Sequence, residues 1–235
     1  MRAASRTHIG NVRASNQDAL IVVPGKYGLY GVADGMGGHK AGDVASQMAV
    51  RVLGQELEKK KPSEALLRRG IEKANLMIYE EQKRNPDYSG MGTTLTVIWE
   101  DKTKVLLGHV GDSRAYRLRN GEIEQISQDH SMVAEMVRSG VITEEEARVH
   151  PYRNIITRAL GAEEDVETDV TELDKQAGDL YLICSDGLSE YVRDPEMRDV
   201  LLRMSLEDAA DELLARALEG GGRDNISLVI AEVTA

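Results

Sequence analysis

The stretch VADGMGGHKAG, from Val32 to Gly42, ends an apolar run on one carboxylate and then places three glycines within four residues. Asp34 can offer its carboxylate to a cation. Gly35 can offer its carbonyl oxygen, because a residue without a side chain lets the backbone approach a ligand. The next glycines let the chain turn back into a helix that begins near Lys40. A phosphate-binding loop is the competing interpretation, but no Gly-Lys-Ser/Thr follows and the spacing does not match G-x-G-x-x-G.

Three other aspartates occupy comparable places in the sequence. Asp112 and Asp186 directly follow apolar runs, and Asp224 directly precedes one. If these strand ends meet at one rim, the carboxylates raise one another's pKa and destabilise the fold unless cations lie among them. Oxygen ligands without Cys or clustered His suit Mg²⁺ or Mn²⁺ better than Zn²⁺. Taken singly, each aspartate could instead be a turn former that bonds its own backbone.

Composition limits the class of protein. A chain of 235 residues with 41% hydrophobic content can bury one core, and we expect a single domain over residues 1–235. The formal net charge of −11 argues against binding to nucleic acid or to an anionic membrane surface. The single Cys184 excludes an intrachain disulfide and fits a reducing compartment. No apolar run approaches the length of about 18 residues that a membrane helix needs, so we expect a cytoplasmic protein without membrane insertion.

Short apolar or alternating runs predict β-strands along the whole chain. An Asn-Gly pair at Asn120 lies between two of these runs and predicts a tight antiparallel hairpin. The predicted strands are residues 19–23, 27–34, 93–100, 104–112, 115–126 (both arms of the hairpin), 179–186 and 225–233.

Helical periodicity appears between the strands. Apolar residues recur at intervals of three and four in residues 41–57 and again in 63–83, which predicts two successive amphipathic helices. Ser205 with Asp208, and Thr143 with Glu146, have the spacing of capping boxes at two further helix starts. Strands grouped with strands and helices paired with helices favour an α+β sandwich of packed sheets flanked by helices over strict alternation.

Eight motifs in order resemble the metal-dependent PPM protein phosphatases, the type 2C serine/threonine phosphatases, in their bacterial branch. The resemblance covers about residues 3–233 and implies an α-β-β-α sandwich: two antiparallel sheets between antiparallel helix pairs, with a small flap subdomain at about residues 131–160. The motifs are RASNQD (13–18), VADGMGGH (32–39), MGTT (91–94), HVGDSRAY (109–116), SQDHS (127–131), HPYRN (150–154), CSDGLSE (184–190) and GGRDNIS (221–227).

The resemblance implies a catalytic centre with two core ions, Mn²⁺ or Mg²⁺. Asp34 would bridge both ions, and Asp186 and Asp224 would complete the first site. The carbonyl of Gly35 would help to hold the second ion, and Asp18 would support it directly or through a coordinated water. A water held between the ions would attack the phosphorus directly, without a covalent phosphoenzyme.

A third ion and a substrate arginine are also implied. Asp112 with Asp186 matches the ligands of the third ion, and Arg13 matches the arginine that grips the substrate phosphate, for which its planar fork is suited. Without that role, Arg13 is one more solvated surface charge. Many eukaryotic members place a general-acid His directly after the Asp-Gly pair, but here that position is Met36. His39 is the remaining candidate for the general acid, and it could equally be a capping or surface group.

The other histidines have less specific settings. His109 lies inside an apolar run and is predicted to be a core residue. His130 and His150 flank the flap, where substrate contact and simple capping are both open. Within the flap, the sequence predicts two short helical pieces joined by a turn.

Three classes of function remain. A protein phosphatase acting on phosphoserine and phosphothreonine is favoured, because every ligand position is filled. A non-catalytic regulatory module of the same fold would be favoured by loss of an aspartate ligand or of Arg13, and neither is lost. A small-molecule phosphatase stays open, because catalytic residues alone do not select the leaving group. The resemblance implies phosphoprotein partners, with a bacterial serine/threonine kinase or its targets among them, and we expect a monomer.

Overall fold

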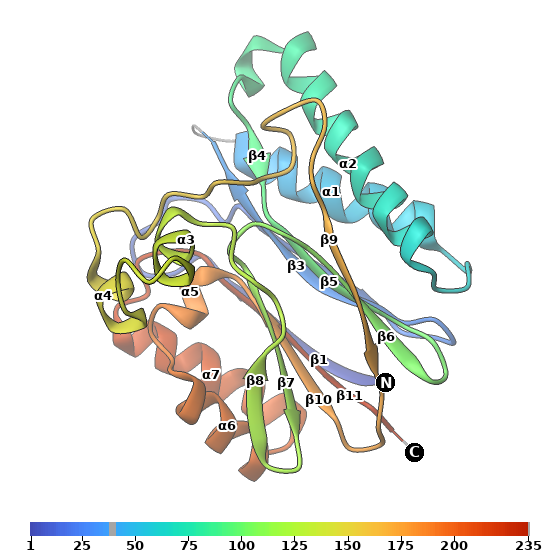
Figure 1. The fold of residues 1–235 in the computed structure, drawn as a ribbon, viewed down its shortest axis with the longest axis vertical. Helices are drawn as coiled ribbons and strands as arrows, with labels where there is room; N and C mark the ends of the chain where they lie inside the picture. Colours follow the sequence, from blue (N-terminus) through green and yellow to red (C-terminus); the bar gives the residue numbers. More distant parts are fainter. Residues whose placement is uncertain (38–40, 235) are drawn as a thin grey trace.

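Two antiparallel sheets face each other at the centre of the molecule (Figure 1). The computed structural model describes residues 1–37 and 41–234. The first sheet has the spatial order β1 (Arg2–His8), β11 (Ile226–Glu232), β10 (Leu180–Cys184), β7 (Arg114–Arg119) and β8 (Glu122–Gln125). The two ends of the chain therefore pair with each other at one edge of this sheet.

The second sheet contains Val32–Met36, the first part of the glycine-rich stretch. Its spatial order is β2 (Asp18–Val23), β3 (Leu29–Met36), β5 (Leu95–Glu100), β6 (Lys104–Val110) and β9 (Asp169–Asp174), with the short β4 (Gly92–Thr93) paired to the end of β3. All of these pairs are antiparallel.

One helix pair covers the outer face of each sheet (Figure 1). Helices α1 (Ala41–Leu57) and α2 (Glu64–Arg84) pack on the second sheet, and α6 (Asp194–Arg203) and α7 (Leu206–Gly220) pack on the first. The short elements are η1 (Pro86–Tyr88), α3 (Met132–Arg138), α4 (Glu144–Val149) and α5 (Asp186–Ser189). The predicted α+β sandwich is confirmed.

Alternation along β3 shows how the strands build three apolar layers. Tyr30 and Val32 point to the layer between the sheets, whereas Leu29 and Ala33 point to the layer under α1 and α2. Successive strand residues face opposite sides, so a strand buried on both faces reads as a continuous apolar run. This explains why the central strands were predictable from the sequence.

Two edge strands, β1 and β9, and the helical segments η1, α5 and α6 were not predicted. β1 and β9 have the sequences RAASRTH and DVTELD, and most of their residues are only partly buried or exposed. A strand that buries little apolar surface has no apolar run to reveal it. Helix α6 was missed as well, although Pro195 lies in its first turn.

The structure contains the predicted hairpin turn and both predicted helix caps, with one difference at Ser205. Asn120 and Gly121 both have positive φ and join β7 to β8, as the Asn-Gly pair predicts. Thr143 and Glu146 form the reciprocal capping box at α4. Ser205 caps α7 by accepting the amide of the third helical residue, but the returning carboxylate bond of a capping box is not among its described hydrogen bonds.

The flap lies beside the end of the sandwich where α5 begins (Figure 1). Its helices α3 and α4 are the two short pieces that the sequence predicts, joined by a turn at Gly140. Among the described residues, we find no helix that combines the length and the apolar character needed to cross a bilayer.

Candidate active site

Strand pairing places two aspartates directly opposite each other. Asp18 at the start of β2 is the register partner of Asp34 near the end of β3. Strand β3 continues two residues past Asp34, so this carboxylate lies within the strand and not after it. Like charges directly opposite each other destabilise a sheet. The pairing therefore favours a cation between these two strands.

Three more aspartates reach the same place from other segments. Asp186 begins α5 directly after β10, and Asp224 directly precedes β11, the neighbour of β10 in the first sheet. Asp112 follows β6. The charges of Asp18, Asp112, Asp186 and Asp224 all act on Asp34. These interactions place the carboxylates near Asp34, and their joint role as metal ligands stays a prediction.

Burial and mutual repulsion dominate the electrostatics of this cluster. Burial, then the charge of Asp18, raises the pKa of Asp34 well above its ordinary value. Burial likewise raises the pKa of Asp18 to about 7 and that of Asp186 to about 6, with neighbouring carboxylates adding to both shifts. Burial and the charge of Asp186 raise the pKa of Asp112. Each shift means that a second ionised carboxylate is unfavourable here until positive charge is added.

Two carboxylate oxygens in the cluster are buried without a partner among the described residues. They are Oδ1 of Asp18 and Oδ1 of Asp186. The other oxygen of Asp18 accepts a hydrogen bond of 2.9 Å from the Ser185 hydroxyl, which fixes the side chain. A buried polar atom without a partner is costly, and a hard cation satisfies it. This donor set fits Mn²⁺ or Mg²⁺.

Arg13 lies against the cluster, as its predicted role requires. Its Nη2 donates to Oδ2 of Asp224 at 2.6 Å, and the amide of Asn225 donates to Oδ1 of Asp224 at 2.8 Å. Both oxygens of Asp224 are therefore engaged. Within residues 1–37 and 41–234, no three Asp, Glu, His or Cys side chains already stand close enough to hold an ion without moving. An ion that used Asp224 would have to compete with Arg13.

Asn225 is a residue that the sequence analysis did not single out. It is 4% exposed, and its Oδ1 accepts from the amide of Gln17 at 2.8 Å. Its Nδ2 donates to the carbonyls of Ile9 and Ser15. One amide side chain thus fastens the loop that carries Arg13 to the segment that carries Asp224. Its place beside Asp224 in the GGRDNIS motif was the only signal in the sequence.

The geometry around Gly35 explains why a glycine directly follows Asp34. A Cβ on Gly35 would lie 2.1 Å from the carbonyl oxygen of Gly42 and 2.5 Å from that of Gln17. The chain therefore turns back against itself here, as the sequence predicts, and only glycine fits. The amide of Gly35 donates to the Gln17 carbonyl at 3.1 Å. His39 lies outside the described residues, so its predicted role stays a prediction.

A buried pair of hydroxyls connects the ends of β3 and β6. The amide of Asp34 donates to Oγ1 of Thr94 at 2.9 Å, and Oγ1 of Thr94 lies 2.7 Å from Oγ of Ser113. Thr94 and Ser113 are fully buried. This connection holds the backbone of Asp34 close to the segment that carries Asp112.

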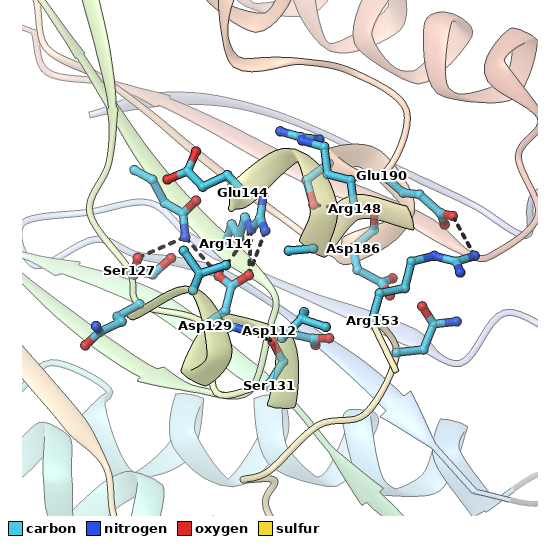
Figure 2. A pocket seen from close by; sticks show the side chains of 18 of the residues that line it. Asp112, Arg114, Ser127, Asp129, Ser131, Glu144, Arg148, Arg153, Asp186 and Glu190 are labelled. Carbon is cyan, nitrogen blue, oxygen red and sulfur yellow. Dashed lines mark hydrogen bonds and ion pairs between the residues drawn. The ribbon is translucent and has the colours of Figure 1, made fainter. Parts of the chain in front are cut away.

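A cavity of about 460 Å³ opens between the flap, the β7–β8 hairpin and α5. Figure 2 shows Asp112 and Asp186 among the residues that line it, together with Ser131, Arg148 and Arg153 of the flap. Arg153 of the flap lies 3.6 Å from Glu190 across the cavity, and Arg114 pairs with Asp129 at 2.7 Å. The cavity is continuous with the carboxylate cluster, since Asp112 and Asp186 belong to both.

The structure shows the surroundings of His109, His130 and His150, for which a core position, helix capping or substrate contact was predicted. His109 is 1% exposed and is a core residue, as predicted. His150 is the C-cap of α4, and its Nδ1 accepts from the Tyr152 amide, which supports the capping alternative. His130 is buried, and Ser131 caps α3 in its place.

Comparison with known sequences identifies the family of this chain. The sequence model of the family described as protein phosphatase 2C matches residues 6–220. The chain belongs to the protein phosphatase 2C family. It is 41% identical over 241 aligned positions to the serine/threonine phosphatase stp of Listeria welshimeri, covering 99% of this chain and 96% of that protein. It is 42% identical over 236 positions to the phosphatase PstP of Mycobacterium tuberculosis, covering 99% of this chain and 45% of that protein.

Solved structures agree with the fold. The crystal structure of M. tuberculosis PstP superposes with a TM-score of 0.93 at 40% identity, covering 100% of this chain and 99% of that one. The catalytic domain of PstP in complex with two manganese ions superposes with a TM-score of 0.91 at 40% identity, covering 100% and 98%. The predicted family, fold and class of metal-dependent serine/threonine protein phosphatase are confirmed. The individual ligands stay a prediction.

Proposed function

We propose that the carboxylate cluster is the catalytic centre of a phosphatase that hydrolyses phosphoserine and phosphothreonine in proteins, with Mn²⁺ or Mg²⁺ as its cofactor. The observation that carries the proposal is the meeting of five aspartates from separate segments beside Arg13. Asp34, Asp186 and Asp224 would hold the first ion, and Asp34, the Gly35 carbonyl and Asp18 the second. When bound, the two ions supply an activated water and positive charge for the phosphoryl oxygens.

The protein's own residues prepare the reaction in three ways. Arg13, which is half-exposed beside the cluster, can bind two phosphate oxygens through its planar fork. The backbone amide of Asp34 donates to Thr94, which holds the backbone that carries the carboxylate. The cavity bounded by the flap leaves room for residues next to the phosphoresidue. We assign Asp112, with Asp186, to a third ion at the wall of this cavity.

Protein substrates are favoured over small phosphate esters. The cavity beside the cluster leaves room for peptide residues next to the phosphoresidue. The relatives stp and PstP are named serine/threonine phosphatases. We therefore infer phosphoprotein partners, among them a serine/threonine kinase or its targets. We also infer a monomer of one domain in the cytoplasm, where the buried free Cys184 would stay reduced.

Phosphate release tests the proposal directly. The chain is incubated with Mn²⁺ and either a phosphoserine or phosphothreonine peptide or a sugar phosphate. We expect hydrolysis of the peptides, and its loss in Asp34→Asn and in Asp186→Asn. Asp87→Asn is the matched control, because this exposed aspartate lies in η1 and not in the cluster. Retained turnover in either cluster variant would reject the site, and a preference for the sugar phosphate would reject the protein substrate.

A further inference from the structure

A group of polar side chains with a buried centre lies at the base of the flap, outside the carboxylate cluster. Its centre is His130, which is 6% exposed. The backbone amide of His130 donates to the Gly111 carbonyl at 2.8 Å, and the amide of Gly111 donates back to Nδ1 of the His130 ring at 3.0 Å. His130 thus makes hydrogen bonds to both the carbonyl and the amide of Gly111. The residue after Gly111 is Asp112.

The turn at Gly111 has little freedom of its own. Its φ of +111° is one that other residues rarely adopt, and a Cβ there would lie 2.6 Å from the side chain of Thr94. The direction in which Asp112 leaves this turn therefore depends on how the Gly111 peptide groups are held. His130 is the residue that holds them.

The other nitrogen of the His130 ring fixes its tautomer. Because the Gly111 amide must donate, Nδ1 carries no proton, and the ring proton of a neutral imidazole is on Nε2. Nε2 lies 3.2 Å from Oδ2 of Asp169, which accepts a hydrogen bond from it. Nη1 of Arg158 donates to Oδ1 of Asp169 at 3.0 Å. The same Nη1 lies 2.9 Å from Nε2 of His130, and because a guanidinium can only donate, this contact opposes a proton on Nε2 that the hydrogen bond to Asp169 favours. Asp169 selects the tautomer, and Arg158 holds Asp169.

The same residues join the two arms of the flap. The amide of Thr157 donates to the His130 carbonyl at 2.9 Å, and Ser131 forms a bridge with Ile156. Arg158 follows directly on the second arm. Both arms therefore meet at the residue that holds Gly111.

We propose that His130 is a positioning residue that aims the carboxylate of Asp112, with Asp169, which Arg158 holds in place, keeping its ring in the required tautomer. The inference rests on the proposed function, because it takes Asp112 as a ligand of the third ion. Groups that orient metal ligands commonly change metal affinity by about 10–100-fold when they are lost.

Two substitutions separate the functions of the two ring nitrogens. In His130→Asn, the amide oxygen can take the place of Nδ1 and accept from Gly111. In His130→Gln, the amide reaches toward Asp169 and leaves the Gly111 amide without its acceptor. Free Mn²⁺ is measured by electron paramagnetic resonance during a titration of each protein. The Asp112→Asn variant shows how much Mn²⁺ binding is lost when the proposed ligand itself is removed. We expect His130→Gln to weaken the weakest site by about tenfold or more. His130→Asn should stay within about threefold of the wild type, and the tighter sites should be unchanged in both.

Several results would overturn the inference. Equal Mn²⁺ isotherms for His130→Gln and the wild type would do so, as would equal losses in the two variants. An Asp112→Asn protein with wild-type Mn²⁺ binding would remove the ligand on which the inference rests. The proposed function is tested separately, by phosphate release in Asp34→Asn. If neither His130 variant folds, two-bond ¹H–¹⁵N spectra of the wild type still decide. A proton on Nδ1 would exclude the hydrogen bond from the Gly111 amide, and a proton on Nε2 supports it.

Discussion

Arg13 and Asp224 form a direct ion pair, with 2.6 Å between Nη2 and Oδ2, at the edge of a cluster of buried carboxylates. The pair joins a side chain proposed to bind phosphate to one proposed to bind metal. An ion that took up Asp224 would release Arg13 for an anion, so that one event would prepare both groups.

Replacement of Arg13 by Ala should mainly raise the KM for phosphopeptide. A hydrogen bond to a charged group contributes about 1.5–3 kcal/mol, which corresponds to an increase of about 10–100-fold. Arg13→Lys should recover only part of the loss, because a point charge does not make the paired contacts of a guanidinium. Mn²⁺ affinity should not fall in Arg13→Ala, because a competing cation has been removed. Steady-state kinetics and an Mn²⁺ titration measure both effects, and an unchanged KM would remove the proposed role of Arg13.

Asp18→Asn should have opposite effects on the metal-free and the Mn²⁺-loaded protein. Asp18 faces Asp34 across the strand pair, and its burial opposes its charge, so the neutral amide should stabilise the metal-free fold by about 1–3 kcal/mol at pH 8. The same change removes negative charge that favours an ion and should weaken Mn²⁺ binding. Urea unfolding with EDTA and with Mn²⁺ tests the prediction, which fails if the variant is less stable than the wild type in EDTA.

The parts of the site that lie at the ends of central strands could be predicted from the sequence. Asp34, Asp112 and Asp186 follow apolar runs, and buried central strands are readable because both of their faces are apolar. Asp18 was reached only through the family resemblance, because its position opposite Asp34 depends on strand register, which a single sequence does not contain.

The supporting residues could not be predicted for a related reason. His130, Arg158 and Asp169 are far apart in the chain, and Asp169 begins the edge strand β9, which has no apolar run. The contact of Asn225 with the loop of Arg13 spans more than two hundred residues. Such contacts are set by tertiary packing and not by local pattern.

His109 should make a contribution to stability that is lost in acid. Burial lowers the pKa of His109 from 6.5 to about 4, whereas the unfolded chain keeps the ordinary value. Between these values the unfolded state binds a proton that the folded state does not, so stability falls as the pH falls from about 6.5 to about 4. The full effect is on the order of 3 kcal/mol.

The variant His109→Gln isolates this contribution. Gln can still donate to the Gln128 carbonyl that the ring contacts at 3.0 Å, but it does not titrate. In EDTA, the unfolding free energy of the wild type minus that of the variant should fall by about 3 kcal/mol from pH 7.5 to pH 4. The carboxylate cluster is common to both proteins and cancels in this difference. A difference that is constant across the pH range would contradict the prediction.

Asn225→Ala should act on the substrate through Arg13. The change removes three buried hydrogen bonds to the loop of Ile9, Ser15 and Gln17, which should cost about 2–4 kcal/mol of stability. With the loop released, Arg13 loses its fixed position, and the KM for phosphopeptide should rise while kcat changes little. The double variant with Arg13→Ala should then raise KM no further than Arg13→Ala alone, because both changes remove the same contact. Fully additive effects on KM would show that Asn225 serves the fold and not the placement of Arg13.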